Sequence, residues 1–105
     1  MIKAEYDYNA MELTMTGHAG AEKVNGYDLV CCSASVLLYT LIWSCKAYPG
    51  MIRNMEYHAD PGDAYIKIEP NPESYEPILH RYESCLEGLR MLQEQYPDCI
   101  QVNGI

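Results

Sequence analysis

The sequence lacks phenylalanine and has few basic residues. It carries 7 lysines and arginines against 15 aspartates and glutamates, which gives a formal net charge of -8 over 105 residues. A surface of this sign repels the phosphate backbone of nucleic acids, because such binding depends on lysine and arginine contacts. We therefore expect no direct nucleic-acid partner, whereas a basic protein or peptide would be attracted to the chain.

No two cysteines follow a C-x-x-C spacing. The five cysteines form an odd set, at Cys31, Cys32, Cys45, Cys85 and Cys99. This set fits neither a disulfide framework nor a zinc ribbon, so we expect reduced thiols, no bound metal and no other cofactor. Reduced thiols are typical of a reducing compartment.

The pattern of a secretory signal is also missing. Residues 1–5 alternate charged with apolar side chains, and no long apolar run follows them, which predicts a cytoplasmic protein. The longest uncharged stretch, residues 29–45, lies at the short limit for crossing a membrane and contains several serines and threonines. We therefore favour a helix buried on several sides over a membrane span.

Alternating apolar and polar residues predict two β-hairpins. The first pairs residues 2–7 with 11–16, and the second pairs residues 51–58 with 64–69 around a turn at 60–63 that contains proline and glycine. Cys99 to Val102 can add one more short strand. The sequence therefore predicts five strands.

Two helices are expected between these strands. The first runs from Leu29 to Cys45, with Asp28 as its cap and Pro49-Gly50 as its stop. The second is amphipathic and ends before Pro97. Its predicted core stripe repeats at helical spacing: Tyr75, Ile78, Leu79, Tyr82, Leu86, Leu89, Leu92 and Tyr96.

The element order is strand, strand, helix, strand, strand, helix, strand. This order predicts an α+β fold in which a mainly antiparallel sheet packs with one buried and one amphipathic helix. A chain of this length has room for one core, so residues 1–105 are expected to form a single domain.

Two features of the sequence suggest chemistry. His18 stands among small residues at the end of a strand, and Cys31 stands in the first turn of the uncharged helix. Unpaired N–H groups at a helix start favour a thiolate by about 0.3–1 kcal/mol, so a full shift of the pKa also needs a nearby imidazolium. His18 is then the candidate base, and the same N–H groups are candidates for holding an oxyanion.

The residues around His18 suit the passage of a peptide. Gly17 and Ala19 are small enough to let a substrate backbone approach the imidazole ring. Gly20 and Gly26 bracket a polar loop, residues 21–27, that ends in Tyr27. Because glycine absorbs large backbone changes, we expect this loop to close over a bound peptide as a lid.

The segments T-G-H-A-G at residues 16–20 and D-L-V-C-C-S-A-S at 28–35 resemble the ribosomal-processing cysteine proteases, the Prp family. The resemblance spans nearly the whole chain. It implies a homodimer that removes a short N-terminal extension from a large-subunit ribosomal protein. Carried over by position, it makes His18 and Cys31 catalytic, with Asp28 as a cap that orients the site and Ser35 as a packing or hydrogen-bonding residue.

Cys32 departs from the family pattern, which has a small residue at this position. Adjacent helical residues point about 100° apart, so we expect Cys32 to face away from His18 and into the core. Two other functions stay open: a non-catalytic ribosome-associated binding module, and a redox sensor that uses Cys31 and Cys32. A metal site at these residues lacks the usual ligand spacing, and His58 and His80 are expected on the surface.

Overall fold

Five strands form one sheet in the order β3-β4-β2-β1-β5. The computed structural model describes residues 1–104. β1 (Ile2–Asp7) pairs antiparallel with β2 (Glu12–Thr16), and β3 (Ile52–Asp60) pairs antiparallel with β4 (Asp63–Pro70). β4 pairs antiparallel with β2, which joins the two hairpins into one sheet, and β5 (Ile100–Gly104) pairs parallel with β1. Both predicted hairpins and the last short strand are thus confirmed.

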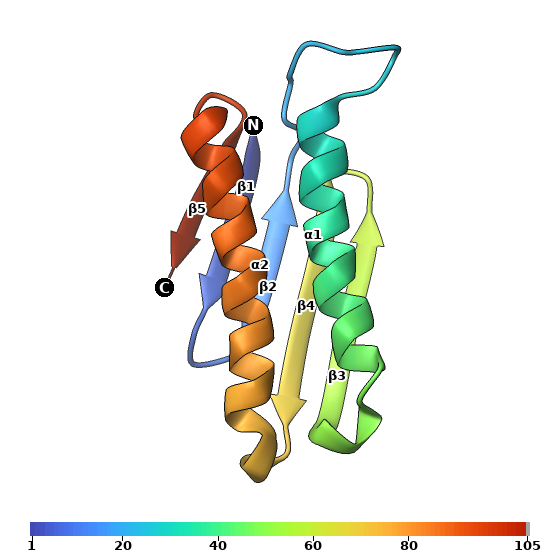
Figure 1. Cartoon of the computed structure of the whole chain (residues 1–105), viewed down its shortest axis with the longest axis vertical. Coiled ribbons are helices and arrows are strands. Elements are labelled where there is room, and N and C mark those ends of the chain that lie inside the picture. Colours follow the sequence, from blue (N-terminus) through green and yellow to red (C-terminus); the bar gives the residue numbers. More distant parts are fainter. Residues whose placement is uncertain (105) are drawn as a thin grey trace.

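Two long helices lie side by side on the same face of this sheet (Figure 1). They are α1 (Leu29–Lys46) and α2 (Tyr75–Gln95). Short 3₁₀ turns, η1 (Pro49–Met51) and η2 (Pro72–Ser74), connect the second hairpin to the two helices. The element order and the α+β class agree with the prediction from the sequence.

The core lies between the sheet and the helices. On β1, Ile2, Ala4 and Tyr6 are buried, while Lys3 and Glu5 are exposed on the opposite face of the sheet. This alternation follows from the strand period of two. The helix-covered face is therefore apolar and the other face is polar.

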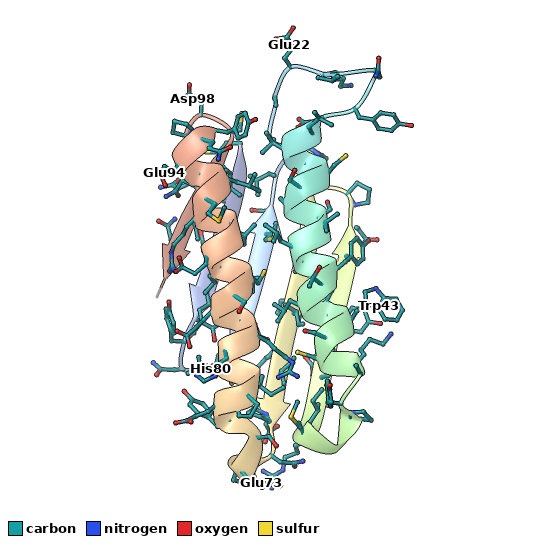
Figure 2. All side chains as sticks on the ribbon, viewed as in Figure 1. Glu22, Trp43, Glu73, His80, Glu94 and Asp98 are labelled. Carbon is teal, nitrogen blue, oxygen red and sulfur yellow. The ribbon has the colours of Figure 1, made fainter. Side chains whose placement is uncertain are left out.

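α1 is apolar on all sides but buried on only one. Its buried side chains are those of Val30, Ala34, Leu38, Leu41, Ile42 and Cys45. Leu29, Val36, Tyr39 and Trp43 are exposed, and Figure 2 shows Trp43 projecting away from α2. By length and mean hydropathy, 1.6 over Leu29–Lys46, this helix could cross a membrane. The prediction that it is buried on several sides is wrong, because the side that carries Leu29, Val36 and Trp43 is exposed.

α2 buries most of its predicted stripe, including Ile78, Tyr82, Leu86 and Leu89. Tyr75 and Tyr96 are exposed, so their placement in the core was wrong. A helix of 21 residues is about 31 Å long, whereas the six residues of β1 span about 20 Å. The ends of α2 therefore overhang the strand beneath them.

Two tyrosines stand where a phenylalanine would suit the core. The rings of Tyr6 and Tyr82 stack with their centroids 5.0 Å apart, and both side chains are fully buried. The Tyr6 hydroxyl has no hydrogen-bond partner within the described residues. Burial raises the pKa of Tyr6 far above its ordinary value, so this hydroxyl stays protonated.

We expect Tyr6→Phe to stabilise the fold by about 1 kcal/mol, because the buried hydroxyl loses its hydration without gaining a hydrogen bond. Urea unfolding monitored by circular dichroism would measure the change. Tyr8→Phe is the matched control, since the half-exposed Tyr8 hydroxyl lies 3.4 Å from Arg90 Nη2 and its removal should change little. A less stable Tyr6→Phe variant would mean that the hydroxyl has a partner, such as a buried water.

Candidate active site

His18 and Cys31 line the same cavity. His18 lies in the connection that follows β2, and Cys31 lies in the first turn of α1. The cavity has a volume of about 240 Å³, and the turn between β3 and β4 forms its far wall. Apolar side chains that line it include Ile2, Met15, Ala34 and Leu38. Its other lining residues include Ser35, Tyr39, Asp60, Gly62 and Asp63.

Asp28 holds this site together. Its Oδ1 accepts hydrogen bonds from the N–H groups of Val30 and Cys31, both at 3.0 Å. Its Oδ2 accepts a third from the N–H of Ala21 at 3.1 Å. These bonds, the one from Cys31 above all, lower the pKa of the Asp28 carboxyl. Asp28 therefore caps α1 and also ties the connection that contains His18 to the helix start.

Three N–H groups at the start of α1, those of Val30, Cys31 and Cys32, already have acceptors and are not free to hold an oxyanion. Those of Val30 and Cys31 donate to the Asp28 side chain, and that of Cys32 donates to the Asp28 carbonyl at 3.0 Å. The prediction that they serve the reaction is therefore wrong, because the cap uses them. The Cys31 thiol itself accepts a hydrogen bond from the N–H of Ala19, at 3.2 Å from Sγ.

The surroundings of Cys31 favour its thiol over the thiolate. Burial raises its pKa, the hydrogen bond from Ala19 lowers it, and the negative charge of Asp28 raises it again. We expected the helix start to favour the thiolate, but burial raises the pKa of Cys31 most, and the capping carboxylate adds to this against the positive end of the helix. Cys31 consequently needs a base before it can act as a nucleophile.

The His18 ring lies against the turn between β3 and β4. The His18 side chain is exposed and makes no hydrogen bond to Cys31. A Cβ built on Gly62 would lie 2.7 Å from His18 Nε2, so the ring touches the bare Cα of this glycine. The sequence predicts residues 60–63 only as a turn, and no local pattern signals this contact across the fold.

The small residues beside His18 have structural reasons of their own. Gly17 adopts φ 87° and its N–H donates to the Gly62 carbonyl at 2.9 Å. A Cβ on Gly17 would collide with the Met1 carbonyl oxygen. The Ala19 side chain is buried, and its backbone N–H faces the thiol. The sequence had suggested that Gly17 and Ala19 are small in order to leave room beside the ring. In the structure their size is explained first by these backbone contacts and by burial.

Ser35 and Cys32 lie on different sides of α1. Ser35 follows Cys31 by one helical turn and lines the same cavity. Cys32 is exposed and does not line it. The prediction that Cys32 enters the core is wrong, because Val30 and Ala34 occupy the buried side of the helix.

The loop between His18 and α1 carries a small hairpin at its tip. Val24 and Tyr27 exchange two backbone hydrogen bonds, of 2.9 and 3.0 Å. Between them Asn25 (φ 52°) and Gly26 (φ 84°) form a two-residue turn of the type favoured by Asn-Gly. Tyr27 is 66% exposed, and the loop projects beyond the start of α1, with Glu22 far from the helices (Figure 2).

The other histidines lie where the sequence predicts them. His58 is exposed on β3, with its Nε2 3.3 Å from Asp63 Oδ2, and His80 is exposed on α2. Within residues 1–104, no group of three or more histidine, cysteine, aspartate or glutamate side chains is placed to hold a metal ion.

The family of cysteine proteases described as Cysteine protease Prp matches residues 1–101. The chain is therefore a cysteine protease. It belongs to the Prp family, as the resemblance of its two motifs implies. No curated protein matches the chain in sequence.

Crystal structures of related proteins share the fold along its whole length. The essential ribosomal processing protease Prp from S. aureus, in complex with a covalently linked product peptide, is 26% identical with a TM-score of 0.73, and 100% of both chains is covered. The same enzyme with a substrate peptide gives 21% identity, a TM-score of 0.69 and 100% coverage of both chains. SMU.848 from Streptococcus mutans gives 24% identity and a TM-score of 0.73, covering 100% of this chain and 94% of that one.

We expect Asp28→Ala to destabilise the fold by about 1 kcal/mol at pH 7, through loss of the helix cap. The pKa of Asp28 is lowered in the folded chain. Its contribution is therefore fully present above the ordinary aspartate pKa of about 4 and is lost as pH falls through the lower folded value. Thermal unfolding of both proteins from pH 7 to pH 2.5 should show the difference shrinking at low pH.

Asp28→Asn is the matched control, because asparagine is about as good a helix cap as aspartate. It should keep most of the stability while weakening the bond to Ala21, since the amide nitrogen cannot accept a hydrogen bond. Equal destabilisation by Ala and Asn would contradict the account of Asp28 as a cap.

Proposed function

We propose that this chain is a ribosomal-processing protease that removes a short N-terminal extension from a large-subunit ribosomal protein. Cys31 is the nucleophile and His18 is the general base. The observation that carries the proposal is the cavity lined by both side chains in a member of a cysteine protease family. The S. aureus relative, a ribosomal processing protease with a covalently linked product peptide, supports the same chemistry.

In this mechanism the imidazole of His18 approaches Cys31 and removes the thiol proton. The sulfur then attacks the scissile carbonyl carbon, and the S–C bond forms as the peptide C–N bond breaks. The imidazolium gives its proton to the departing amine. Water, activated by the same imidazole, hydrolyses the thioester and restores the thiol. The protonated resting thiol makes this base necessary.

The N–H of Ala19 is the best-placed donor for the developing oxyanion. It already points at Cys31 Sγ from 3.2 Å, and the attacked carbonyl must come within bonding distance of that sulfur. When the S–C bond forms, the negative charge moves from sulfur to the carbonyl oxygen. A fixed N–H beside the sulfur can follow that charge with little reorganisation.

The charge of the chain favours a basic substrate. The net charge is -8, and Asp60 and Asp63 are among the residues that line the cavity. An N-terminal segment of a basic ribosomal protein would be attracted by this field, and its association would slow as salt screens it. The apolar side chains that line the cavity would receive an uncharged side chain near the scissile bond.

The homodimer and the cytoplasmic location implied by the sequence stay predictions. The exposed apolar side chains of α1 support a partner surface, because Leu29, Val36, Tyr39 and Trp43 follow one side of the helix at spacings of seven, three and four residues.

Cys31→Ala should abolish cleavage of a peptide that carries the extended ribosomal-protein N-terminus, while Cys32→Ala should keep most of it. Only Cys31 lines the cavity, and Cys32 faces solvent. Chromatography of the cleaved peptides would give kcat/KM for each variant. Equal losses in two folded variants would favour a redox function that uses both thiols.

His18→Ala should lower kcat by about a thousandfold or more, because the base and the nucleophile act as one unit. The double variant His18→Ala/Cys31→Ala should be no worse than Cys31→Ala alone. His80→Ala is the matched control, since His80 is exposed on α2 and outside the cavity. A tenfold effect of His18→Ala would mean that another group removes the proton.

Replacing both Gly20 and Gly26 by alanine should lower kcat/KM for a long peptide. Both adopt positive φ (69° and 84°), which alanine rarely does, so the loop could no longer close as a lid. Alkylation of Cys31 by iodoacetamide should change little, since a small reagent needs no lid. If alkylation and cleavage slow by the same factor, the loop shapes the thiol and is no lid.

A further inference from the structure

The turn between β3 and β4 contacts the proposed base directly. Gly62 stands at the tip of this hairpin with φ 76°, far along the chain from His18. Its carbonyl accepts the N–H of Gly17 at 2.9 Å, which fixes the residue before His18. On the other side of His18, the N–H of Ala19 binds Cys31 Sγ at 3.2 Å. Three consecutive residues thus link the hairpin tip to the thiol.

The imidazole occupies the space that a side chain at position 62 would fill. A Cβ on Gly62 would lie 2.7 Å from His18 Nε2 and 3.0 Å from Cε1. Gly20 and Gly26 also have positive φ, but no atom lies within 4 Å of a Cβ built on either. Glycine is therefore required at position 62 both by its backbone and by the ring that rests on it.

We propose that Gly62 is a positioning residue. Because it has no side chain, the His18 imidazole can rest against its Cα, in a position that we call the seat, without a hydrogen bond to the Cys31 thiol. The ring must leave this seat to remove the thiol proton. The inference rests on the proposed function, in which His18 is the base. It adds that the second hairpin controls how often the base reaches the nucleophile.

Two observations identify this position of the ring as a resting one. Cys31 Sγ accepts its hydrogen bond from the N–H of Ala19, and no hydrogen bond joins it to His18. The His18 ring lies instead against Gly62, 2.7 Å from the place that a Cβ of this residue would take. The cavity between Gly62 and Cys31 gives the ring room to move, since all three residues line it.

A methyl group at position 62 should deny the ring its seat. The ring then moves into the cavity that Cys31 also lines, and the fraction of molecules with His18 near the thiol rises. The test uses the full chain with Cys32→Ala throughout, so that alkylation reports on Cys31. Iodoacetamide modification near pH 7, followed by mass spectrometry of the Cys31 peptide, gives the rate, and NMR gives the chemical shift of His18 Hε1.

We expect Gly62→Ala to shift the His18 resonance and to speed alkylation of Cys31 by about threefold or more. Gly26→Ala is the matched control for backbone strain, because its φ is similar and its Cβ meets nothing. It should change neither readout. The gain should disappear in Gly62→Ala/His18→Ala, compared with His18→Ala alone.

An unchanged or slower alkylation in Gly62→Ala, or a gain that survives without His18, would overturn the proposal. If Gly62→Ala does not fold, Gly62→Asn repeats the test with a residue that tolerates positive φ better. Alkylation needs no peptide substrate, so the two claims fail separately. If Gly62→Ala shows no His18-dependent gain in the alkylation rate while the unsubstituted chain cleaves the peptide, the seat is rejected. If the gain is present but the unsubstituted chain cleaves no peptide, the proposed function is rejected.

Discussion

The site depends on one carboxylate that accepts three backbone N–H groups. Through Val30 and Cys31, Asp28 begins α1, and through Ala21 it holds the connection that carries His18 against the start of that helix. The same negative charge opposes ionisation of the Cys31 thiol. Asp28 therefore joins the start of α1 to the connection that carries His18, and its charge adds to burial, the main cause of the raised pKa of the Cys31 thiol. In the proposed mechanism, the position of the His18 ring then decides how readily Cys31 reacts.

Much of the fold could be predicted because the strands alternate cleanly. On β1 the burial of Ile2, Ala4 and Tyr6 follows directly from the period of two. α1 was harder, because a helix that is apolar on every side gives no sign of which side meets the sheet. The prediction for Cys32 was wrong for this reason. Helix geometry gives its angle to Cys31, but it does not tell which side of the helix faces solvent. Only the assembled sheet and α2 decide it.

The candidate site was predictable where its residues are close in sequence. His18, Asp28, Cys31 and Ser35 lie in two short motifs, and the cavity unites His18, Cys31 and Ser35. The use of the helix-start N–H groups was not predictable, since a cap and a reacting anion compete for the same donors. Gly62 was missed because a proline-glycine turn has sufficient local reasons for its glycine. Its contact with His18 exists only after β4 pairs with β2.

The central claim is that Cys31 forms a covalent bond with the substrate during cleavage. The most direct test is to quench the reaction with acid during turnover of an extended ribosomal-protein N-terminus and to measure the intact and peptide masses. The account predicts a thioester on Cys31 whose added mass equals the released N-terminal segment minus one water. Cleavage that leaves the adduct on another residue would contradict this claim. So would the absence of any adduct when the enzyme is saturated with an ester substrate that acylates it fast and is released slowly, and the reaction is quenched rapidly.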